Sequence, residues 1–291
     1  MTTLRFGWCG VGQMGEAMTA NMLSAGLSLT VWNRSPEKCE PIRALGATVS
    51  ATPKDVFEQS DVIFVMLSTP QVAVDWWNEN RQFVSGKMVV DCATLGLEAI
   101  VKINDLVVNA GGKFLEAPVA GHSGMAKART IEFLCSGNHE VFETVSVAME
   151  AMSKKSHYFG QEIGTASKMK LVVNATLGNM MAACAEGVAL SEKVGLNPEQ
   201  YLEVIGSHVA LSNGLFKLFG PKMLNDDHVP LFMTKHMEKD MGLAVDMSTA
   251  AGQSLPLCTA AHGLYKSAVD DGQAEFHMSA VHRTIKKMKP Q

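Results

Sequence analysis

Residues 4–26 read "LRFGWCGVGQMGEAMTANMLSAG", and this stretch decides the fold. A strand-like apolar run precedes Gly10, Gly12 and Gly15 in a GxGxxG pattern, and a helix-like pattern follows the glycines. In such a unit one glycine makes the tight turn, one lets the backbone approach a pyrophosphate, and one lets the helix pack closely on the strand. The start of the helix then faces the phosphates with unpaired N–H groups.

The glycine pattern alone is a weak signal, because glycines also mark turns that bind nothing. Its place between a strand and a helix, with a second strand-like run "LTVWNR" at 29–34, favours a dinucleotide-binding loop. We therefore predict that a nucleotide cofactor is bound by six consecutive residues: Gly10, Val11, Gly12, Gln13, Met14 and Gly15.

Short apolar runs and helix-length segments alternate as far as residue 137. The later runs are "VIFVML" at 62–67, "KMVVDCA" at 87–93, "KFLEAPV" at 113–119 and "IEFLCSG" at 131–137. Parallel strands need crossover connections, which are usually helical, so the alternation predicts an open α/β sheet of the doubly wound, Rossmann type.

Strand signals become sparse after residue 137, where "SHYFG" at 156–160 is the last strand-like run. The segment 166–193 contains no proline and only two glycines, Gly178 and Gly187, so it predicts one long helix. We predict a Rossmann domain at 1–163 and an all-helical domain for substrate binding and oligomerisation at 164–291, joined by this long interdomain helix.

Composition narrows the class of protein. The chain has 291 residues, a formal net charge of −4 and no basic run longer than Lys286 and Lys287, which argues against a nucleic acid partner. Its six cysteines show no metal-ligand spacing, so we predict no metal site and a reducing compartment. A strand-like run from Leu4 leaves no room for a signal peptide, and we find no stretch of about 18 apolar residues. We expect a cytoplasmic protein with no membrane partner.

The end of the second strand selects the cofactor. NAD-binding proteins usually carry an acidic residue there, whereas this chain has Asn33, Arg34 and Ser35. A carboxylate would repel a 2′-phosphate, and a guanidinium can hold one through two charge-assisted hydrogen bonds. NADP (NADPH) is the predicted cofactor. The alternative is that Arg34 is a solvated loop arginine.

Four segments together resemble the β-hydroxyacid dehydrogenase family. They are "FGWCGVGQMGEAMTANMLSAG" (6–26), "GGKFLEAPVAG" (111–121), "GTASKMKLVVN" (164–174) and "FMTKHMEKDMGLA" (232–244). The resemblance implies a Rossmann domain, a helical domain, an active site in the cleft between them, and homodimers or homotetramers. "VWNRSPEK" at 31–38 is similar to the glyoxylate and succinic semialdehyde reductase branch, whose members use NADPH.

The resemblance also implies roles for single residues. Lys170 matches the catalytic lysine and Asn174 the asparagine beside it. At i and i+4 they share one helical face, where an ammonium can act as general acid and an amide can orient a carbonyl group. The alternative for a lysine in an apolar run is a side chain that extends its charge to solvent. Of the other matches, Thr94, Met66, Leu67 and Lys239 are expected to contact the cofactor, and Lys239 and Asp240 the substrate, although Met66 and Leu67 also fit a strand core.

The predicted substrate loop departs from the family. The family usually has a serine followed by glycines after "APV", and this chain has Ala120, Gly121 and His122. Backbone N–H groups of Gly121 and His122 can still bind a carboxylate, and His122 or Ser123 can replace the missing hydroxyl. The alternative is that His122 points to solvent. The family usually has glycine near Arg129, which is either a surface residue or binds an anionic group on the substrate or cofactor.

The predicted function is NADPH-dependent reduction of a small carboxylate-bearing aldehyde or 2-oxo acid, of the glyoxylate or succinic semialdehyde type, with Lys170 as general acid. The alternative within the class is NAD-dependent oxidation of a 3-hydroxy acid such as 3-hydroxyisobutyrate. Imine reduction and a non-catalytic nucleotide-binding module are two further alternatives. Both occur in relatives that lose the lysine, so the presence of Lys170 argues against them.

Overall fold

The computed structural model describes residues 4–208 and 214–288. The chain divides into two compact units, Met1–Lys170 and Leu171–Gln291. The division falls inside a continuous helix, a few residues after the position that the sequence pattern favours. The domain boundary at residue 163 therefore stays a prediction, and each unit is described by itself.

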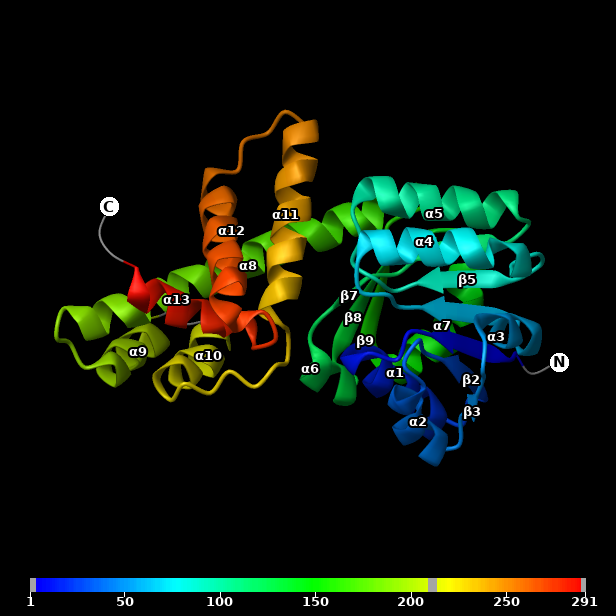
Figure 1. The fold of residues 1–291 in the computed structure, drawn as a ribbon, viewed down its shortest axis with the longest axis horizontal. Helices are drawn as coiled ribbons and strands as arrows, with labels where there is room; N and C mark the ends of the chain where they lie inside the picture. Colours follow the sequence, from blue (N-terminus) through cyan, green and yellow to red (C-terminus); the bar gives the residue numbers. More distant parts are fainter. Residues whose placement is uncertain (1–3, 209–213, 289–291) are drawn as a thin grey trace. The chain divides into compact units, whose positions relative to one another are not determined.

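The first unit is built around a mixed sheet (Figure 1). Its strands are β1 (Phe6–Cys9), β2 (Leu29–Trp32), β3 (Thr48–Val49), β4 (Val62–Val65), β5 (Met88–Asp91), β6 (Lys113–Glu116), β7 (Val119–Ala120), β8 (Ile131–Gly137) and β9 (Ser153–Tyr158). The order is β3-β2-β1-β4-β5-β6-β8-β7, and β9 pairs with β8. From β3 to β6 all neighbours are parallel, whereas β8 runs antiparallel to β6 and β7.

Helices cover both faces of this sheet (Figure 1). One face carries α1 (Gln13–Ser24) and α7 (His139–Met152), and the other carries α3 (Pro53–Gln59), α4 (Pro70–Asn80) and α5 (Leu97–Asn109). Shorter helices, α2 (Glu40–Ala44) and α6 (Ser123–Lys127), lie in connections. The predicted Rossmann-type, doubly wound fold is confirmed. Strands β3 and β7 were not predicted, because two residues are too few to give a pattern.

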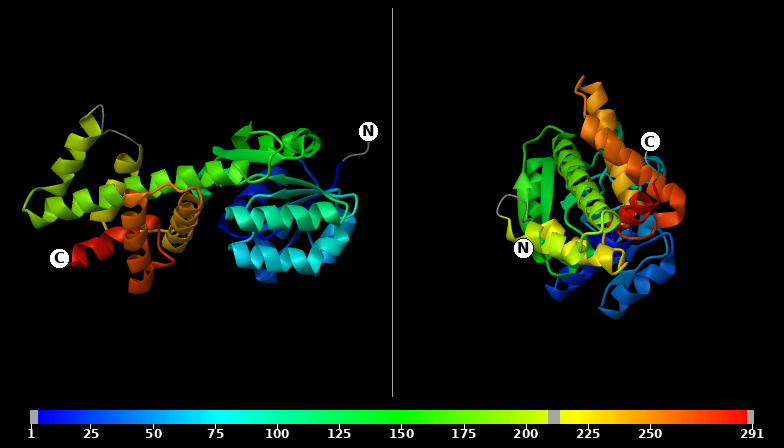
Figure 2. Two further views of the ribbon diagram at one scale, coloured as in Figure 1. Left: turned by 90° about the horizontal axis from the view of Figure 1, so that it is seen from above. Right: turned by 90° about the vertical axis from the view of Figure 1, so that its left-hand side faces the viewer.

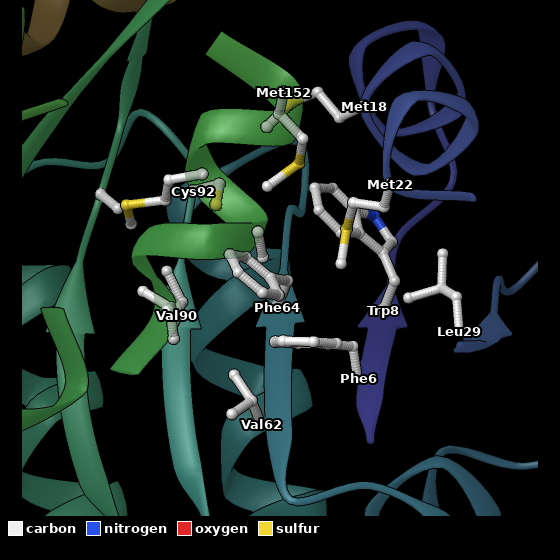
Figure 3. Close-up of a cluster of buried hydrophobic side chains, with 14 of the residues drawn as sticks. Phe6, Trp8, Met18, Met22, Leu29, Val62, Phe64, Val90, Cys92 and Met152 are labelled. Atoms are coloured by element: carbon white, nitrogen blue, oxygen red, sulfur yellow. The ribbon is translucent and has the colours of Figure 1, made fainter. Parts of the chain in front are cut away.

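The core beneath α1 and α7 follows the alternation of side chains along a strand. Phe6 and Trp8 of β1 point to this face with Phe64 of β4, and the rings of Trp8 and Phe64 stack with centroids 5.5 Å apart (Figure 3). The next residue along each strand, Cys9 after Trp8 and Val65 after Phe64, enters the core on the opposite face. Because both faces of the parallel strands are buried, their sequences read as continuous apolar runs.

The second unit is mostly helical. Its helices are α8 (Thr165–Lys193, which starts in the first unit), α9 (Pro198–Ser207), α10 (Gly214–Leu224), α11 (Thr234–Ala250), α12 (Pro256–Ala268) and α13 (Val281–Lys287). The predicted helical second half is confirmed, although, within the described residues, an isolated β-bridge joins Met233 and His277. Helix α8 is continuous, as predicted for 166–193 (Figure 2).

The expectation that no segment is apolar enough to span a bilayer was wrong for α8. Within the described residues, this one helix is long and apolar enough by length and composition, and half of its most apolar window is buried. Its apolar side chains have a packing reason, since Leu171, Met181 and Val188 are fully buried in the core of the second unit. Length and composition are thus weak evidence for a membrane span here, because a core helix passes the same test.

The second unit contains a cluster of buried histidines, and we expect the stability of this unit to depend on pH because of it. His228 is buried, and its Nδ1 lies 2.8 Å from the hydroxyl of Ser279, which also lies 2.9 Å from Nδ1 of His277. Burial first, and then the charge of Arg283, lower the pKa of His228 from 6.5 to about 4, although Asp226 opposes this shift.

We predict that the protein loses stability as the pH falls from 6.5 towards 4. The folded state resists protonation of His228 and the unfolded state does not, so the stabilisation is present above 6.5 and is lost below it. Between pH 7.5 and 5 the loss that depends on this residue is about 1–2 kcal/mol. Urea unfolding of the wild type and of His228→Asn at both pH values measures it. Equal pH dependence in the two proteins would rule out His228 as the titrating group.

Candidate functional site

The glycine loop lies between β1 and α1, and two of its glycines are required by the fold. Gly10 has a φ of +102°, and an added Cβ would lie 2.3 Å from the carbonyl oxygen of Met66. At Gly15 an added Cβ would lie 2.5 Å from the carbonyl oxygen of Gly10. Both positions therefore exclude any side chain.

Gly12 differs from these two glycines, because the fold does not require it. An added Cβ would meet nothing within 4 Å, and its φ of −91° is accessible to any residue. Gly12 is also the N-cap of the twelve-residue helix α1, where no side chain caps the first turn. Open space above an uncapped helix N-terminus fits a phosphate group of a dinucleotide.

A pocket of about 190 Å³ opens beside this loop. It is lined by Gly10, Val11, Gly12, Trp32, Asn33, Arg34, Ser35, Lys38, Met66, Leu67, Ser68, Val72 and Trp76. The pocket lies at the carboxyl ends of β1, β2 and β4, where the strand order turns from β1 to β2 on one side and to β4 on the other. Doubly wound sheets bind their ligands at this kind of switch point.

Asn33 connects the loops that form the pocket. Its Oδ1 accepts a hydrogen bond of 2.9 Å from the backbone N–H of Val11, and its Nδ2 donates one of 3.0 Å to the carbonyl of Ser35. The side chain thus holds the glycine loop against the segment after β2. A carboxylate could not donate the second hydrogen bond. Asparagine at position 33 therefore has a structural role in addition to its predicted contact with the cofactor.

Two cations line the pocket after β2. Arg34 and Lys38 are both exposed, and the ion pairs found among the described residues involve neither of them. Sequence reasoning missed Lys38, although its spacing of four residues from Arg34 was a usable signal. This pair can accept an anionic group at the edge of the pocket.

The pocket also has an aromatic wall, formed by Trp32 and Trp76. Trp32 and Trp76 have ring centroids 6.3 Å apart, and Trp76 also stacks on Phe57. The neighbouring Trp77 is fully buried instead, and its Nε1 donates to Asp91 at 3.4 Å. A flat apolar wall of this kind suits an aromatic ring such as adenine.

The loop after β5 carries Thr94, which does not line this pocket. Its start is fixed by Asp91, whose Oδ1 accepts a hydrogen bond of 3.0 Å from the backbone N–H of Ala93. Asp91 is fully buried, and burial raises its pKa to about 7. The role of Thr94 near the cofactor stays a prediction.

His122 caps the short helix α6. Its Nδ1 accepts hydrogen bonds from the backbone N–H groups of Gly124 (3.2 Å) and Met125 (3.4 Å), and burial lowers its pKa. The ring is therefore neutral at pH 7 and carries its proton on Nε2, which is a hydrogen-bond donor. Ala120 ends β7, and Gly121 follows with a φ of +141°. Their substrate contacts stay predictions.

Arg129 has a role within the first unit. Its φ is +57°, a left-handed conformation that explains why glycine suits this position. Its Nε donates a hydrogen bond of 3.4 Å to Asn21 of α1, whose own Nδ2 donates to the carbonyl of Ala126. The arginine therefore connects the loop before β8 to helix α1.

Helix α8 carries Lys170 and, one turn later, Asn174. Both are buried, with relative exposures of 4% and 2%. In the second unit, Nδ2 of Asn174 donates a hydrogen bond of 2.6 Å to Oδ2 of Asp240 on α11, and the ammonium of Lys239 lies 3.1 Å from the other oxygen. Three predicted residues, Asn174, Lys239 and Asp240, are thus brought together.

This arrangement fixes the orientation of the Asn174 amide. A carboxylate only accepts hydrogen bonds, so Asn174 must turn its nitrogen towards Asp240. Its carbonyl oxygen then faces the other way and can accept from an ammonium or a hydroxyl group. Asp240 is 1% exposed, so its negative charge is compensated mainly by Lys239. Within the described residues, no three His, Cys, Asp or Glu side chains group as metal ligands.

The fold and the glycine loop define a Rossmann-type dinucleotide-binding protein, and comparisons with known proteins give its family. Residues 5–160 match the model of the NAD-binding domain of 6-phosphogluconate dehydrogenase, and residues 164–285 match that of NADP-dependent 3-hydroxyisobutyrate dehydrogenase. The chain belongs to the β-hydroxyacid dehydrogenase family, in its 3-hydroxyisobutyrate dehydrogenase-like branch. It is therefore an NAD(P)-binding oxidoreductase of the hydroxyacid dehydrogenase class.

Two relatives from Arabidopsis thaliana are similar over nearly the whole chain. Glyoxylate/succinic semialdehyde reductase 2, chloroplastic, is 37% identical over 99% of this chain and 81% of its own length. Glyoxylate/succinic semialdehyde reductase 1 is 35% identical over 97% of this chain and 99% of its own. The structure of Mycobacterium tuberculosis 3-hydroxyisobutyrate dehydrogenase with L-serine superposes with a TM-score of 0.86 at 27% identity, over 98% of this chain and 100% of that one.

A third relative has a name that states no enzymatic activity. The human cytokine-like nuclear factor N-PAC is 32% identical over 97% of this chain, which spans about half (51%) of that protein. Family membership therefore gives the oxidoreductase class and leaves the particular reaction to be argued from the site.

The contrast between Gly12 and Gly15 gives a matched prediction. Gly15→Ala places a Cβ against the carbonyl of Gly10 and is expected to destabilise the first unit by about 1–3 kcal/mol. Gly12→Ala has room for its Cβ, so its loss of stability stays at about 1 kcal/mol or less.

The two variants are compared by urea unfolding and by titration with NADPH. We expect Gly12→Ala to raise the Kd for NADPH by about 10-fold or more, since its methyl group occupies the space above the helix N-terminus. A Gly12→Ala variant that binds NADPH as tightly as the wild type would show that the pyrophosphate does not approach the backbone here.

Proposed function

We propose that the protein is an NADPH-dependent reductase of a small aldehyde or 2-oxo acid that carries a carboxylate, of the glyoxylate or succinic semialdehyde type. The observation that carries the proposal is the buried polar pair Lys170 and Asn174 on the otherwise apolar helix α8. Burial of an ammonium group is costly, so its presence in a core helix calls for a functional reason. The similarity to two reductases of these substrates supports the same proposal.

NADPH would supply the hydride, and residues of the chain would stabilise and neutralise the negative charge that the hydride transfer produces. Negative charge grows on the carbonyl oxygen of the substrate during reduction. The ammonium of Lys170 stabilises this charge and then donates the proton that completes the alcohol. Asn174, with its nitrogen held by Asp240, offers its carbonyl oxygen to a donor group and so keeps one orientation. Lys239 would balance the charge of Asp240 beside a carboxylate-bearing substrate.

The decisive experiment follows NADPH oxidation against a panel of small aldehydes and 2-oxo acids. We expect turnover by the wild type and a kcat about 10²–10⁴-fold lower in Lys170→Ala, the usual range for the loss of a general acid. Lys168→Ala is the matched control, because Lys168 lies on the same helix, is exposed and pairs with Glu162 at 3.2 Å.

Two outcomes of this experiment would contradict the proposal. Full activity of Lys170→Ala would remove Lys170 from the mechanism. No turnover of any substrate by the wild type would favour the alternative of a non-catalytic nucleotide-binding protein.

The choice of NADP over NAD is a second part of the proposal. Arg34 and Lys38 line the pocket at the end of β2, where a 2′-phosphate would lie in a protein of this fold. We propose that both bind this phosphate, the guanidinium through two hydrogen bonds and the ammonium as a point charge.

We predict that Arg34→Ala raises the KM for NADPH by about 10–100-fold, the range for a hydrogen bond to a charged group. The KM for NADH should change by less than about 3-fold, since that cofactor has no 2′-phosphate. Lys38→Ala should show the same preference with a smaller effect. Steady-state kinetics with both cofactors provide the measurement, and an equal loss with both would exclude a phosphate clamp.

A second candidate activity is the oxidation of a 3-hydroxy acid. The similarity to the 3-hydroxyisobutyrate dehydrogenase structure favours it, and the same Lys170 would then act as general base. Adding hydroxy acids and NAD or NADP to the panel separates the two directions. Homodimeric or homotetrameric assembly, cytoplasmic localisation and the absence of nucleic acid or membrane partners stay predictions.

A further inference from the structure

The carboxyl end of β6 holds a buried carboxylate that the proposed function does not use. Glu116 is the last residue of β6 and is fully buried, with an exposure of 0%. In the sheet register it lies between Asp91 of β5 and Ser136 of β8. Burying a carboxylate is unfavourable unless its oxygens accept hydrogen bonds or pair with a charge. The hydrogen-bond partners of Glu116 therefore indicate its role.

Both oxygens of Glu116 accept hydrogen bonds at the start of helix α8. Oε1 accepts from the hydroxyl of Ser136 and from the backbone N–H groups of Gly164 (2.5 Å) and Ala166 (3.3 Å). Oε2 accepts from the backbone N–H (3.2 Å) and the hydroxyl (2.6 Å) of Ser167. Most of these donors come from residues 164–167, the first turn of α8 and the residue before it.

The charge of Glu116 is balanced by the helix and not by a cation. The ion pairs among the described residues do not include Glu116. The amino end of a helix carries a partial positive charge and N–H groups without partners inside the helix, and α8 is 29 residues long. Glu116 thus supplies both the hydrogen-bond acceptors and the charge that this end requires.

These contacts fix the rotation of α8 as well as its position. One oxygen holds Gly164 and Ala166 and the other holds Ser167, so the first turn cannot slide or rotate without losing a hydrogen bond. Lys170 follows at i+3 from Ser167 and at i+4 from Ala166, which places it on the same side of the helix. The hydrogen bonds to Glu116 in the first turn of α8 therefore determine the direction in which Lys170, one turn later, leaves the helix.

We propose that Glu116 is a positioning residue for Lys170. Its kinetic consequence rests on the proposed function, because it assumes that Lys170 is the general acid. Catalytic groups must be held within about 0.5 Å of the productive geometry, and a displacement of about 1 Å can reduce the rate about 100-fold. Glu116 meets this need without contacting the substrate, through a helix whose start it anchors.

Two variants test the anchor. Glu116→Gln keeps the shape of the side chain but turns an NH2 group towards N–H donors of α8, and Ser167→Ala removes one hydroxyl donor only. We expect kcat to fall about 10–100-fold in Glu116→Gln and about 3–10-fold in Ser167→Ala, with the Kd for NADPH within about 2-fold of the wild type. Ile103 of α5 lies in the hydrophobic core, and Ile103→Val and Ile103→Ala are the controls. The kcat of each test variant is compared with that of the control whose Tm falls by a similar amount.

A second readout works without substrate. Competitive labelling with acetic anhydride across a pH series, followed by peptide mass spectrometry, reports the reactivity and pKa of single lysines. Glu116→Gln and Ser167→Ala should both change the labelling profile of Lys170 and leave that of the exposed Lys102 on α5 unchanged, whereas the Ile103 variants should change neither.

The outcomes separate this inference from the proposed function. If the wild type reduces no substrate, the proposed function fails and the labelling of Lys170 still decides the inference. Unchanged labelling of Lys170 in the Glu116 and Ser167 variants, or a kcat no lower than in the Ile103 controls, overturns the inference. Should Glu116→Gln not fold, Ser167→Ala carries the test by the same criteria.

Discussion

The close approach of two backbone segments at Gly10 is the constraint on which the first unit depends. The carbonyl of Met66, just after β4, occupies the place where a side chain at position 10 would lie, and Gly10 adopts a φ of +102° that suits glycine. This contact brings the ends of β1 and β4 together at the point where the strand order turns. The pocket, the start of α1 and the segment from Asn33 to Lys38 all take their places from it. Gly15 then allows α1 to lie directly on the loop.

Helix α8 combines two requirements that usually conflict. Its apolar residues from Leu171 onward fill the core of the second unit, yet the same helix carries two buried polar residues, Lys170 and Asn174. Each unit fixes its own part of the helix: in the first unit Glu116 holds the start of α8, and in the second unit Asp240 holds the amide of Asn174. Buried hydrogen bonds of this kind allow few alternative side-chain positions. The rigidity that the proposed chemistry needs thus follows from the cost of burying polar groups.

The sequence predicted the features that depend on local pattern. Apolar runs located the long strands, the glycine spacing located the turn at Gly10, and the absence of proline located α8. It did not predict Lys38 in the pocket, the cap that His122 makes, or the anchor at Glu116. Glu116 and Ser167 are 51 residues apart in sequence, so their contact depends on how α8 packs on the end of β6. A single sequence contains no signal for such a contact, and a glutamate after an apolar run looks like the ordinary end of a strand.

Chemistry and substrate choice have separate physical supports in this chain. Lys170 is oriented through backbone and hydroxyl donors on α8, which a change in the segment after β7 would not touch. That segment has its own support, since the ring of His122 caps α6 through Nδ1 and leaves Nε2–H as a donor. Because its Nδ1 is committed to the cap, protonating His122 would break the cap as well as change the charge. Under the proposed function, a change at Ala120 or His122 would therefore alter the choice of substrate while the start of α8 stays as it is.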